Sequence, residues 1–195
     1  MKTILLSFIH FLILTTGFSQ SVPTPGKAQT QAIFLSNATI HTGTGEVITP
    51  GGILFTNGKI SAIGMDLKIP ADAKVFDYSG KHIYPGLIAL NTELGLVEIE
   101  AVRSTRDAAE AGNINPSARA IISYNTDSRV TPTVRSNGIL IAQTVPQGGL
   151  ISGRSAIVQL DAWNWEDAAI KTEDAIHVNW PDMKIRDFPD RKSVV

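Results

Sequence analysis

Two residues with oxygen donors, Asn91 and Glu93, follow directly after an apolar run in the stretch YPGLIALNTELGL (84–96). If residues 87–90 begin a strand, side chains alternate along it, so Asn91 and Glu93 would project to the same side of it. A carboxylate and an amide oxygen suit a hard cation such as Mg²⁺, Ca²⁺ or Mn²⁺ better than they suit zinc. The alternative is that both are polar residues at a solvated strand end.

The chain offers few other groups for chemistry. It has no cysteine, which excludes a thiol nucleophile and a Cys-based zinc site. Because a metal site needs several convergent donors, we expect surface or turn roles, and not ligation, for His41, His82 and His177. The charged stretch that holds Arg103 and Arg106 is expected to be a solvated face.

A second polar segment, Gln147-Gly148-Gly149, lies in the later half of the chain. The phosphate-loop pattern G-x-x-x-x-G-K-[ST] is absent there, so we interpret these glycines as loop turns with backbone near a pocket. Gln147, Gly148 and Gly149 therefore join Asn91 and Glu93 as candidates to line that pocket.

The elements that would position these residues fall into two groups. Residues 32–84 are short β-prone runs separated by turn residues, which predicts an all-β unit. Within it, Asn57-Gly58 supplies the two positive-φ positions of a type I′ turn, so a tight hairpin is predicted there. Residues 20–31 combine prolines, a glycine and polar residues, and are predicted to be an extended linker.

After residue 86 the pattern changes to alternating strands and helices. Residues 87–90 and 139–145 are compact apolar runs, which are typical of strands buried on both faces of a parallel sheet. The helix signals are Asn115-Pro116 as N-cap and first helical residue, residues 130–136 closed by Asn137-Gly138, and Asn164 as N-cap of WEDAAIK. Strand, helix and strand at this spacing predict βα units.

The N-terminal residues 1–19 have a lysine, an apolar run and small residues before Gln20, which is a signal peptide pattern. The apolar run is shorter than the roughly 20 residues of a spanning helix, so no stable membrane anchor is expected after cleavage. The protein is therefore predicted to be exported, either periplasmic or secreted. Its net charge of −1, without a basic cluster, predicts no nucleic acid partner.

Several motifs in a fixed order carry a family resemblance. The stretches NATIHTGTGEVITPGGILFTNGKISAIG and AKVFDYSGKHIYPGLI, followed later by SNGILIAQTVPQGGLISGRSAIVQLD, resemble the amidohydrolase superfamily, in particular its imidazolonepropionase-like branch. The resemblance implies a mixed α and β fold. An antiparallel β-sandwich segment, the composite domain (32–84), would precede the first strands and helices of a truncated (β/α)₈ barrel (85–189).

Members of this family bind one or two divalent metals at the barrel mouth and hydrolyse C–N bonds of amides, ureas and cyclic amides. The resemblance aligns Ala89 with the aspartate of their P-G-x-I-D-x-H-x-H motif, and Asn91 and Glu93 with its two histidines. Three alternatives follow: no metal, an oxygen-rich site rebuilt on Asn91 and Glu93, or zinc held by ligands elsewhere. The implied function is hydrolysis of a small substrate with an amide-like C–N bond, and the alternative is a non-catalytic exported binding protein.

A complete barrel of this type has eight strands and about 250 residues. The resemblance therefore implies that the chain is an N-terminal fragment, inactive and without a cofactor by itself, whereas the full-length parent could hold zinc or a harder cation. The last residues, DRKSVV, can be encoded by a common sequencing adapter, which predicts a non-native tail at 190–195. A weaker alternative makes the β segment an independent adhesive sandwich.

Overall fold

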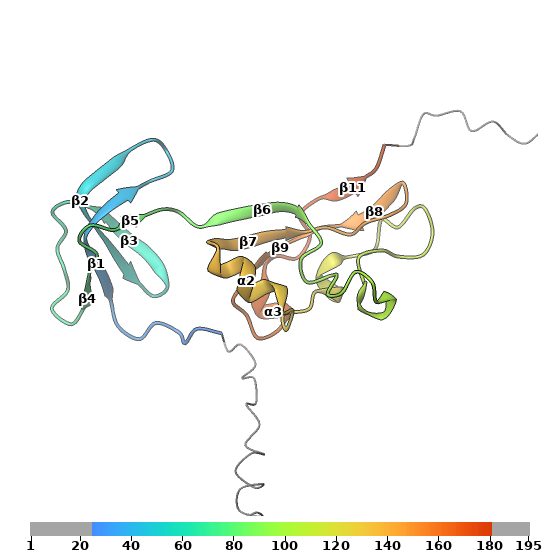
Figure 1. Cartoon of the computed structure of the whole chain (residues 1–195), viewed down its shortest axis with the longest axis horizontal. Helices are drawn as coiled ribbons and strands as arrows, with labels where there is room; N and C mark the ends of the chain where they lie inside the picture. Colours follow the sequence, from blue (N-terminus) through green and yellow to red (C-terminus); the bar gives the residue numbers. More distant parts are fainter. Residues whose placement is uncertain (1–24, 181–195) are drawn as a thin grey trace, which may run out of the picture.

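The computed structural model describes residues 25–180, and these form two bodies joined by a short extended stretch (Figure 1). The first body is a β-sheet, and the second combines strands with short helices. The predicted signal peptide (1–19), the start of the predicted linker (20–24) and the predicted tail (190–195) lie outside the described residues. Within residues 25–180, no helix is long and apolar enough to cross a membrane.

One five-stranded sheet makes up the first body. Its strands are β1 (Ile33–His41), β2 (Val47–Thr56), β3 (Lys59–Gly64), β4 (Lys74–Asp77) and β5 (His82–Ile83). The order is β3-β2-β1-β4, with β5 also pairing with β1. Ala38, Ile40 and Ile53 are buried at its centre, and partly buried apolar side chains pack around them.

The pairing directions correct the predicted antiparallel β-sandwich. The β1–β2 and β2–β3 pairs are antiparallel, but β4 and β5 are both parallel to β1. The described strands of this body also form a single sheet. Alternating residues predict strands but not their pairing direction. The connection through residues 65–73 carries the chain from the β3 edge to the opposite edge of the sheet, where β4 pairs parallel to β1.

The hairpin between β2 and β3 confirms the predicted tight turn. Thr56 pairs with Lys59, and the two residues between them have positive φ, 53° at Asn57 and 72° at Gly58. Asparagine and glycine are the residues that tolerate this conformation best. Local turn chemistry therefore determines the register of this hairpin.

The second body contains two sheets and two short α-helices. Its elements are β6 (Leu87–Thr92), α2 (Val130–Ser136), β7 (Ile139–Thr144), β8 (Ile151–Arg154), β9 (Ala156–Gln159), α3 (Trp165–Ala168), β10 (Ala169–Lys171) and β11 (Ile176–Val178), with 3₁₀ turns η1 (Arg103–Thr105) and η2 (Ala120–Ser123). One sheet has the order β10-β9-β7-β6, and β8 pairs with β11 in the other. β6 and β7 are parallel, which confirms the predicted parallel pair. β9 is antiparallel to β7, so the sheet is mixed and not uniformly parallel as at the start of a barrel.

The prediction of a helix that begins at Asn115-Pro116 is wrong. Only the short turn η2 forms, and the Asn115 side chain donates to the Gly112 carbonyl and caps no helix. Backbone bonds hold this segment extended against β8, from the Asn115 N–H to the Ile151 carbonyl and from the Arg154 N–H to the Ala118 carbonyl. Competition from β8 therefore overrides the local helix signal.

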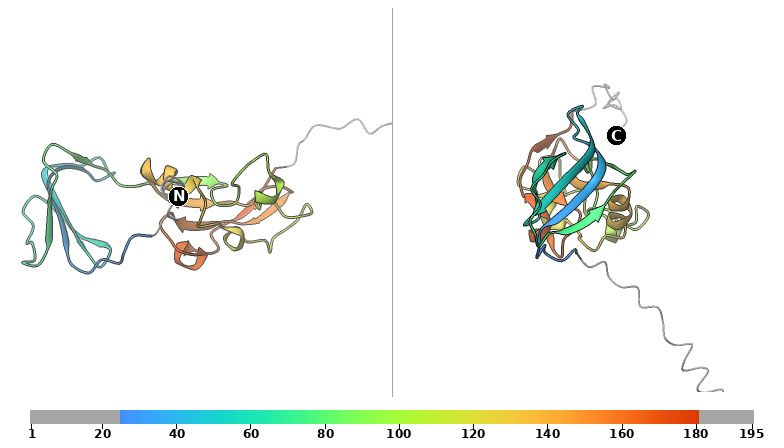
Figure 2. Two further views of the ribbon diagram at one scale, coloured as in Figure 1. Left: turned by 60° about the horizontal axis from the view of Figure 1, so that its bottom comes forward. Right: turned by 90° about the vertical axis from the view of Figure 1, so that its left-hand side faces the viewer.

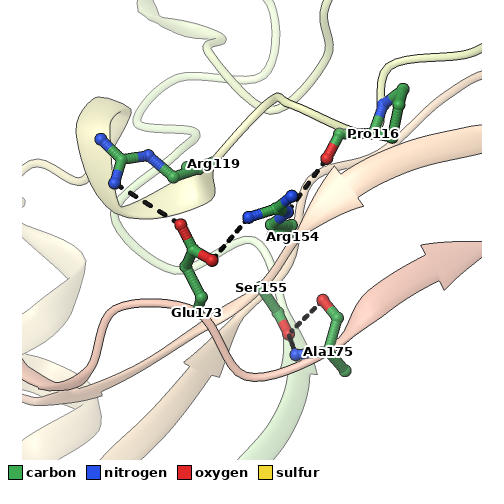
Figure 3. A network of polar contacts seen from close by, with 6 residues as sticks. All are labelled: Pro116, Arg119, Arg154, Ser155, Glu173 and Ala175. Carbon is green, nitrogen blue, oxygen red and sulfur yellow. Dashed lines mark hydrogen bonds and ion pairs between the residues drawn. The ribbon is translucent and has the colours of Figure 1, made fainter.

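Side chains add to this attachment (Figure 3). Glu173 accepts from Arg154 at 2.6 Å and forms an ion pair with Arg119 at 3.6 Å. The Arg154 Nε also donates to the Pro116 carbonyl at 3.1 Å. Ser155, next to Arg154, exchanges hydrogen bonds with the Ala175 backbone, so the loop before β11 is tied to the same region.

The two predicted helix boundaries nearer the C-terminus are confirmed in part. α2 covers residues 130–136 and is followed by Asn137 and then Gly138 at φ 88°, as predicted. The Asn164 side chain accepts from the Asp167 N–H at 2.8 Å, so it is the N-cap of α3. α3 ends at Ala168 because the chain continues directly into β10, which pairs with β9.

β6 is not buried on both faces as predicted. Leu87 is 60% exposed, Ile88 58% and Leu90 70%. The physical reason is that β6 lies at the edge of its sheet and has only β7 as a neighbour among the described strands. The buried core of this body lies further inside, at Ile121, Tyr124, Ala142, Ala156, Val158, Leu160 and Ala168.

An N-terminal segment, residues 25–32, connects the two bodies, and we call it the bridging segment (Figure 2). The Gly26 N–H donates to Asp161 in the second body at 3.1 Å. Three residues later, the Gln29 amide donates to the Phe55 carbonyl in β2 at 2.9 Å and accepts from the Gly58 N–H. Asp161 is also an ion-pair partner of Arg135.

Candidate functional site

The candidate site begins where β6 ends. Asn91 has a left-handed φ of 54°, and the pairing register with β7 is irregular between Ala89 and Thr92. β6 ends at Thr92, so Glu93 lies outside the strand. The regular alternation that predicted a common direction for Asn91 and Glu93 is therefore interrupted, and their shared pocket stays a prediction.

A chain of polar contacts fixes the backbone at Asn91. The Asn91 N–H donates to the Gln143 side chain at 3.2 Å. Gln143 in turn donates to Asp174 at 2.8 Å, and Lys171 donates to the other oxygen of Asp174 at 2.9 Å. The bond from Lys171, followed by that from Gln143, lowers the pKa of Asp174 below its ordinary value. Three strands of one sheet, β6, β7 and β10, are thus connected at this point.

Glu93 lines a cleft of about 320 Å³ together with Arg103, Arg106 and Gln147, and the remaining wall is formed by Ala108 and Ala109. β6 and β7 are parallel, so their carboxyl ends meet at one edge of the sheet. Glu93 follows the end of β6 and Gln147 follows the end of β7. This edge is where open α/β sheets bind their ligands.

The charges of this cleft are unbalanced. Within residues 25–180, the guanidinium groups of Arg103 and Arg106 form neither a salt bridge nor a side-chain hydrogen bond. Glu93 is the one acidic residue of the lining. Guanidinium groups bind carboxylates and other oxyanions in a fork geometry. The cleft can therefore accept a ligand with a negative charge or a polarised carbonyl oxygen. Arg103 and Arg106 are both exposed, as predicted for a solvated face, but a charged stretch in a loop carries no signal that it also lines a cleft.

The structure brings together only part of the predicted pocket lining. Glu93 and Gln147 share the cleft, but Asn91, Gly148 and Gly149 are not among the residues that line it. Gly149 has φ 66°, and a side chain there would approach the Asn113 backbone to 2.7 Å. Gly149 therefore packs on the backbone of residue 113, whereas a side chain at Gly148 would lie 3.5 Å from the Ala109 Cβ. The Gln147 N–H donates to the Ala108 carbonyl, which fixes the loop beside Glu93.

A second, apolar cleft of about 350 Å³ lies between β6 and α2, and Glu93 lines it as well. Its other lining residues are Ala89, Thr92, Leu94, Val97, Val130, Val134 and Ile139. Glu93 thus stands at the boundary between a charged and an apolar cavity. Such a combination suits a ligand with one polar end and one hydrocarbon end.

The donor set at the end of β6 does not fit zinc. Structural and catalytic zinc sites use at least three nitrogen, sulfur or carboxylate ligands from the protein. Among residues 25–180, no group of three or more His, Cys, Asp or Glu side chains lies close enough together to hold a metal ion. Asn91 and Glu93 offer only an amide oxygen and a carboxylate.

The structure also brings together two histidines that are 41 residues apart in the sequence. The Nε2 atom of His41 and the Nδ1 atom of His82 share a hydrogen bond of 3.0 Å. The ring of Tyr84 stacks on His41 with centroids 4.2 Å apart. The surface or turn roles predicted for both histidines do not include this contact, because the parallel pairing of β1 with β5 leaves no signal in a single sequence.

Comparison with solved structures identifies the fold. An amidohydrolase from Thermotoga maritima MSB8 superposes with a TM-score of 0.69 over 75% of this chain, at 22% sequence identity. The chain shares the fold of part of an amidohydrolase. It spans 38% of the length of that amidohydrolase. This likeness agrees with the predicted superfamily fold at its coarser level, that of a partial amidohydrolase fold with mixed strands and helices.

A D-hydantoinase also matches, with 30% identity over 36% of this chain and 15% of its own length, at a TM-score of 0.30. The amino-acid sequence matches no protein-family model and no curated protein. The amidohydrolase fold therefore depends on the first of the two structural likenesses.

Proposed function

We propose that the chain is the N-terminal part of an amidohydrolase-type hydrolase that acts on C–N bonds other than peptide bonds. The observation that carries the proposal is the convergence of Glu93 and Gln147 in one cleft, at the carboxyl ends of β6 and β7, on an amidohydrolase fold. The ordered motifs of the imidazolonepropionase-like branch support the same assignment. The rest of the barrel would come from residues of a full-length parent.

In this proposal, the described residues bind and orient the substrate. Arg103 and Arg106 would hold an anionic or carbonyl oxygen, and Gln147 would donate to or accept from the amide group. Glu93 would accept a proton or hydrogen bond from the same group. The apolar cleft beside Glu93 would take the hydrocarbon part of the substrate.

We also propose that any divalent metal of the whole protein, zinc or a harder cation, takes most of its ligands from outside residues 25–180. Asn91 and Glu93, which align with the family's two histidines, would contribute at most two oxygen atoms. In this chain the family's His-x-His motif would then be replaced by Asn-x-Glu at the same position, the end of β6.

The second candidate is an exported binding protein on the same fold, without catalysis. The donors at positions 91 and 93 favour it, because an amide and a carboxylate are poor substitutes for two imidazoles on zinc. The unpaired guanidinium groups of the cleft would then bind an anionic small molecule. Export, to the periplasm or beyond, is common to both candidates and is supported by the signal peptide pattern.

Assays of the full-length protein distinguish the candidates. The substrates would be a panel of amides, ureas and cyclic amides, with added Zn²⁺, Mg²⁺ or Mn²⁺ and with EDTA, and binding would be followed by thermal shift. Glu93→Gln is the test variant, and Glu110→Gln, an exposed glutamate outside the cleft, is its control. Turnover that EDTA abolishes and that only Glu93→Gln impairs supports the hydrolase. Binding without turnover, weakened only by Glu93→Gln, supports the binding protein, and the absence of both overturns the two candidates.

A further inference from the structure

The histidine pair of the first sheet is a feature that the proposed function does not use. β1 and β5 are parallel neighbours, with Thr39 opposite His82 and Ile40 opposite Ile83. Side chains alternate along each strand, so His41, His82 and Tyr84 lie on the same face of the sheet. Ile40 points to the opposite, buried face, where it is 2% exposed.

Contacts within this group hold the imidazole rings close together. The rings of His41 and His82 have centroids 5.3 Å apart and planes inclined by 24°, so the bonded nitrogens face each other nearly in the ring planes. Tyr84 stacks on a face of the His41 ring, with the two ring planes inclined by 8°. Tyr84 is itself 63% exposed, so the group is open to solvent.

We propose that His41 and His82 form a bidentate binding site for a divalent transition metal on the surface of the first sheet. Neutral imidazole nitrogens are preferred ligands of Cu²⁺, Ni²⁺ and Zn²⁺. With metal–nitrogen bonds of about 2.0–2.1 Å, two nitrogens 3.0 Å apart subtend an angle of about 90° at a common metal ion. This angle matches adjacent positions of a tetragonal Cu²⁺ or Ni²⁺ complex better than the tetrahedral angle of zinc.

Binding requires two changes at the site. The ring that donates the shared hydrogen bond must change tautomer, so that its proton moves to its other nitrogen, and the rings must turn so that both lone pairs point to the metal. His82 is exposed, and its ring lies 6.3 Å from that of Tyr84, whereas the closer stack at 4.2 Å holds the His41 ring. Within residues 25–180, no third His, Cys, Asp or Glu joins the pair, so water fills the remaining coordination positions. The site therefore differs from a closed structural zinc site.

The test titrates the full-length protein with NiCl₂ by calorimetry and follows Cu²⁺ coordination by electron paramagnetic resonance. We expect His41→Ala and His82→Ala each to remove one Ni²⁺ equivalent or weaken it at least tenfold, since even an outer-shell partner contributes about ten- to a hundredfold to metal affinity. Each should also remove one nitrogen-coordinated Cu²⁺ signal. His177→Ala, in β11 of the second body, is the matched control and should leave both unchanged.

Further measurements keep the proposal open to refutation. Tyr84→Phe keeps the aromatic stack and should retain binding, and circular dichroism establishes that each variant is folded. Because protons compete with Ni²⁺ for the imidazole nitrogens, Ni²⁺ affinity should fall as the pH is lowered. Identical Ni²⁺ stoichiometry and affinity in the wild type, His41→Ala and His82→Ala would overturn the site. The outcome is independent of hydrolase activity, which Glu93→Gln tests separately.

Discussion

At the scale of single residues, the contacts that decide the local structure are often made by partners remote in sequence. Gly95 has φ 76°, and a side chain there would overlap the ring of Tyr124, which is buried. Asp174, in the loop between β10 and β11, likewise accepts a hydrogen bond from Gln143 of β7. Both contacts lie close to the end of β6. A substitution that disrupts either contact is therefore expected to affect the position of Glu93 as well.

We expect Gly95→Ala to destabilise the protein more than Gly45→Ala. Both glycines have positive φ, but nothing lies within 4 Å of a side chain at Gly45. The two variants share the backbone strain, so the difference measures the overlap with Tyr124, about 1–3 kcal/mol by the usual cost of overpacking. Chemical denaturation of the full-length protein checks this, and equal destabilisation of the two variants would contradict it.

The pH dependence of stability should include a contribution from Asp174. Its pKa in the folded protein is lowered from 3.8, chiefly by the hydrogen bond from Lys171 and next by that from Gln143. The stabilisation is therefore present above pH 3.8 and disappears as the pH falls through the lower folded-state value. Asp174→Asn should lose less stability than the wild type between about pH 6 and pH 3. Thermal unfolding at both pH values tests this, with Asp72→Asn, an exposed loop residue, as control.

At the scale of elements, the sequence predicts the turns and helix ends that depend on residues adjacent in the chain. It does not predict the features that depend on backbone pairing with a distant strand. The β2–β3 hairpin and the caps of α2 and α3 follow from turn and cap residues that lie within the element. The helix at Asn115-Pro116 fails because β8 binds that segment through its backbone. The candidate cleft shows the same division. The positions of Glu93 and Gln147 could be predicted because both residues follow the ends of strands, whereas the positions of Arg103 and Arg106 depend on how a long loop folds back onto the sheet.

Glu173 allows this attachment of the loop to β8 to be tested. Its two arginine partners are about 40% exposed, so we expect Glu173→Gln to cost at most about 1 kcal/mol of global stability. Locally, residues 115–119 should exchange their amide hydrogens faster, because Arg119 and Arg154 lose their common partner. Hydrogen exchange followed by mass spectrometry measures both effects. Glu166→Gln, in α3, should leave exchange at 115–119 unchanged.

At the scale of the whole molecule, β6 carries an exposed apolar surface near the candidate site. Leu87, Ile88 and Leu90 are all more than half exposed, and the outer edge of β6 has no partner strand within residues 25–180. Exposed edges with apolar side chains favour association with other chains. This surface is the place at which further βα units of the proposed parent would pack.

We expect the 195-residue chain, produced by itself, to aggregate and to show no hydrolase activity. A single strand end cannot both activate water and protonate a leaving amine, since these roles need groups from several strands. Asn91→His combined with Glu93→His should therefore not create activity in this chain. Light scattering and assays over a range of protein concentrations check the prediction. Turnover that scales with the concentration of the purified chain and that chelation abolishes would contradict it.

The bridging segment has a consequence for the order of events during synthesis. The β1–β2–β3 pairings join residues close in sequence, so the first sheet can begin to form while the rest of the chain is still being made. The bond from Gly26 to Asp161 spans 135 residues and must wait. Until Asp161 has been synthesised, the first body is held to later residues only through the stretch before β6. The contact of the bridging segment with Asp161 thus forms later than the first sheet, and it gives the two bodies a second connection.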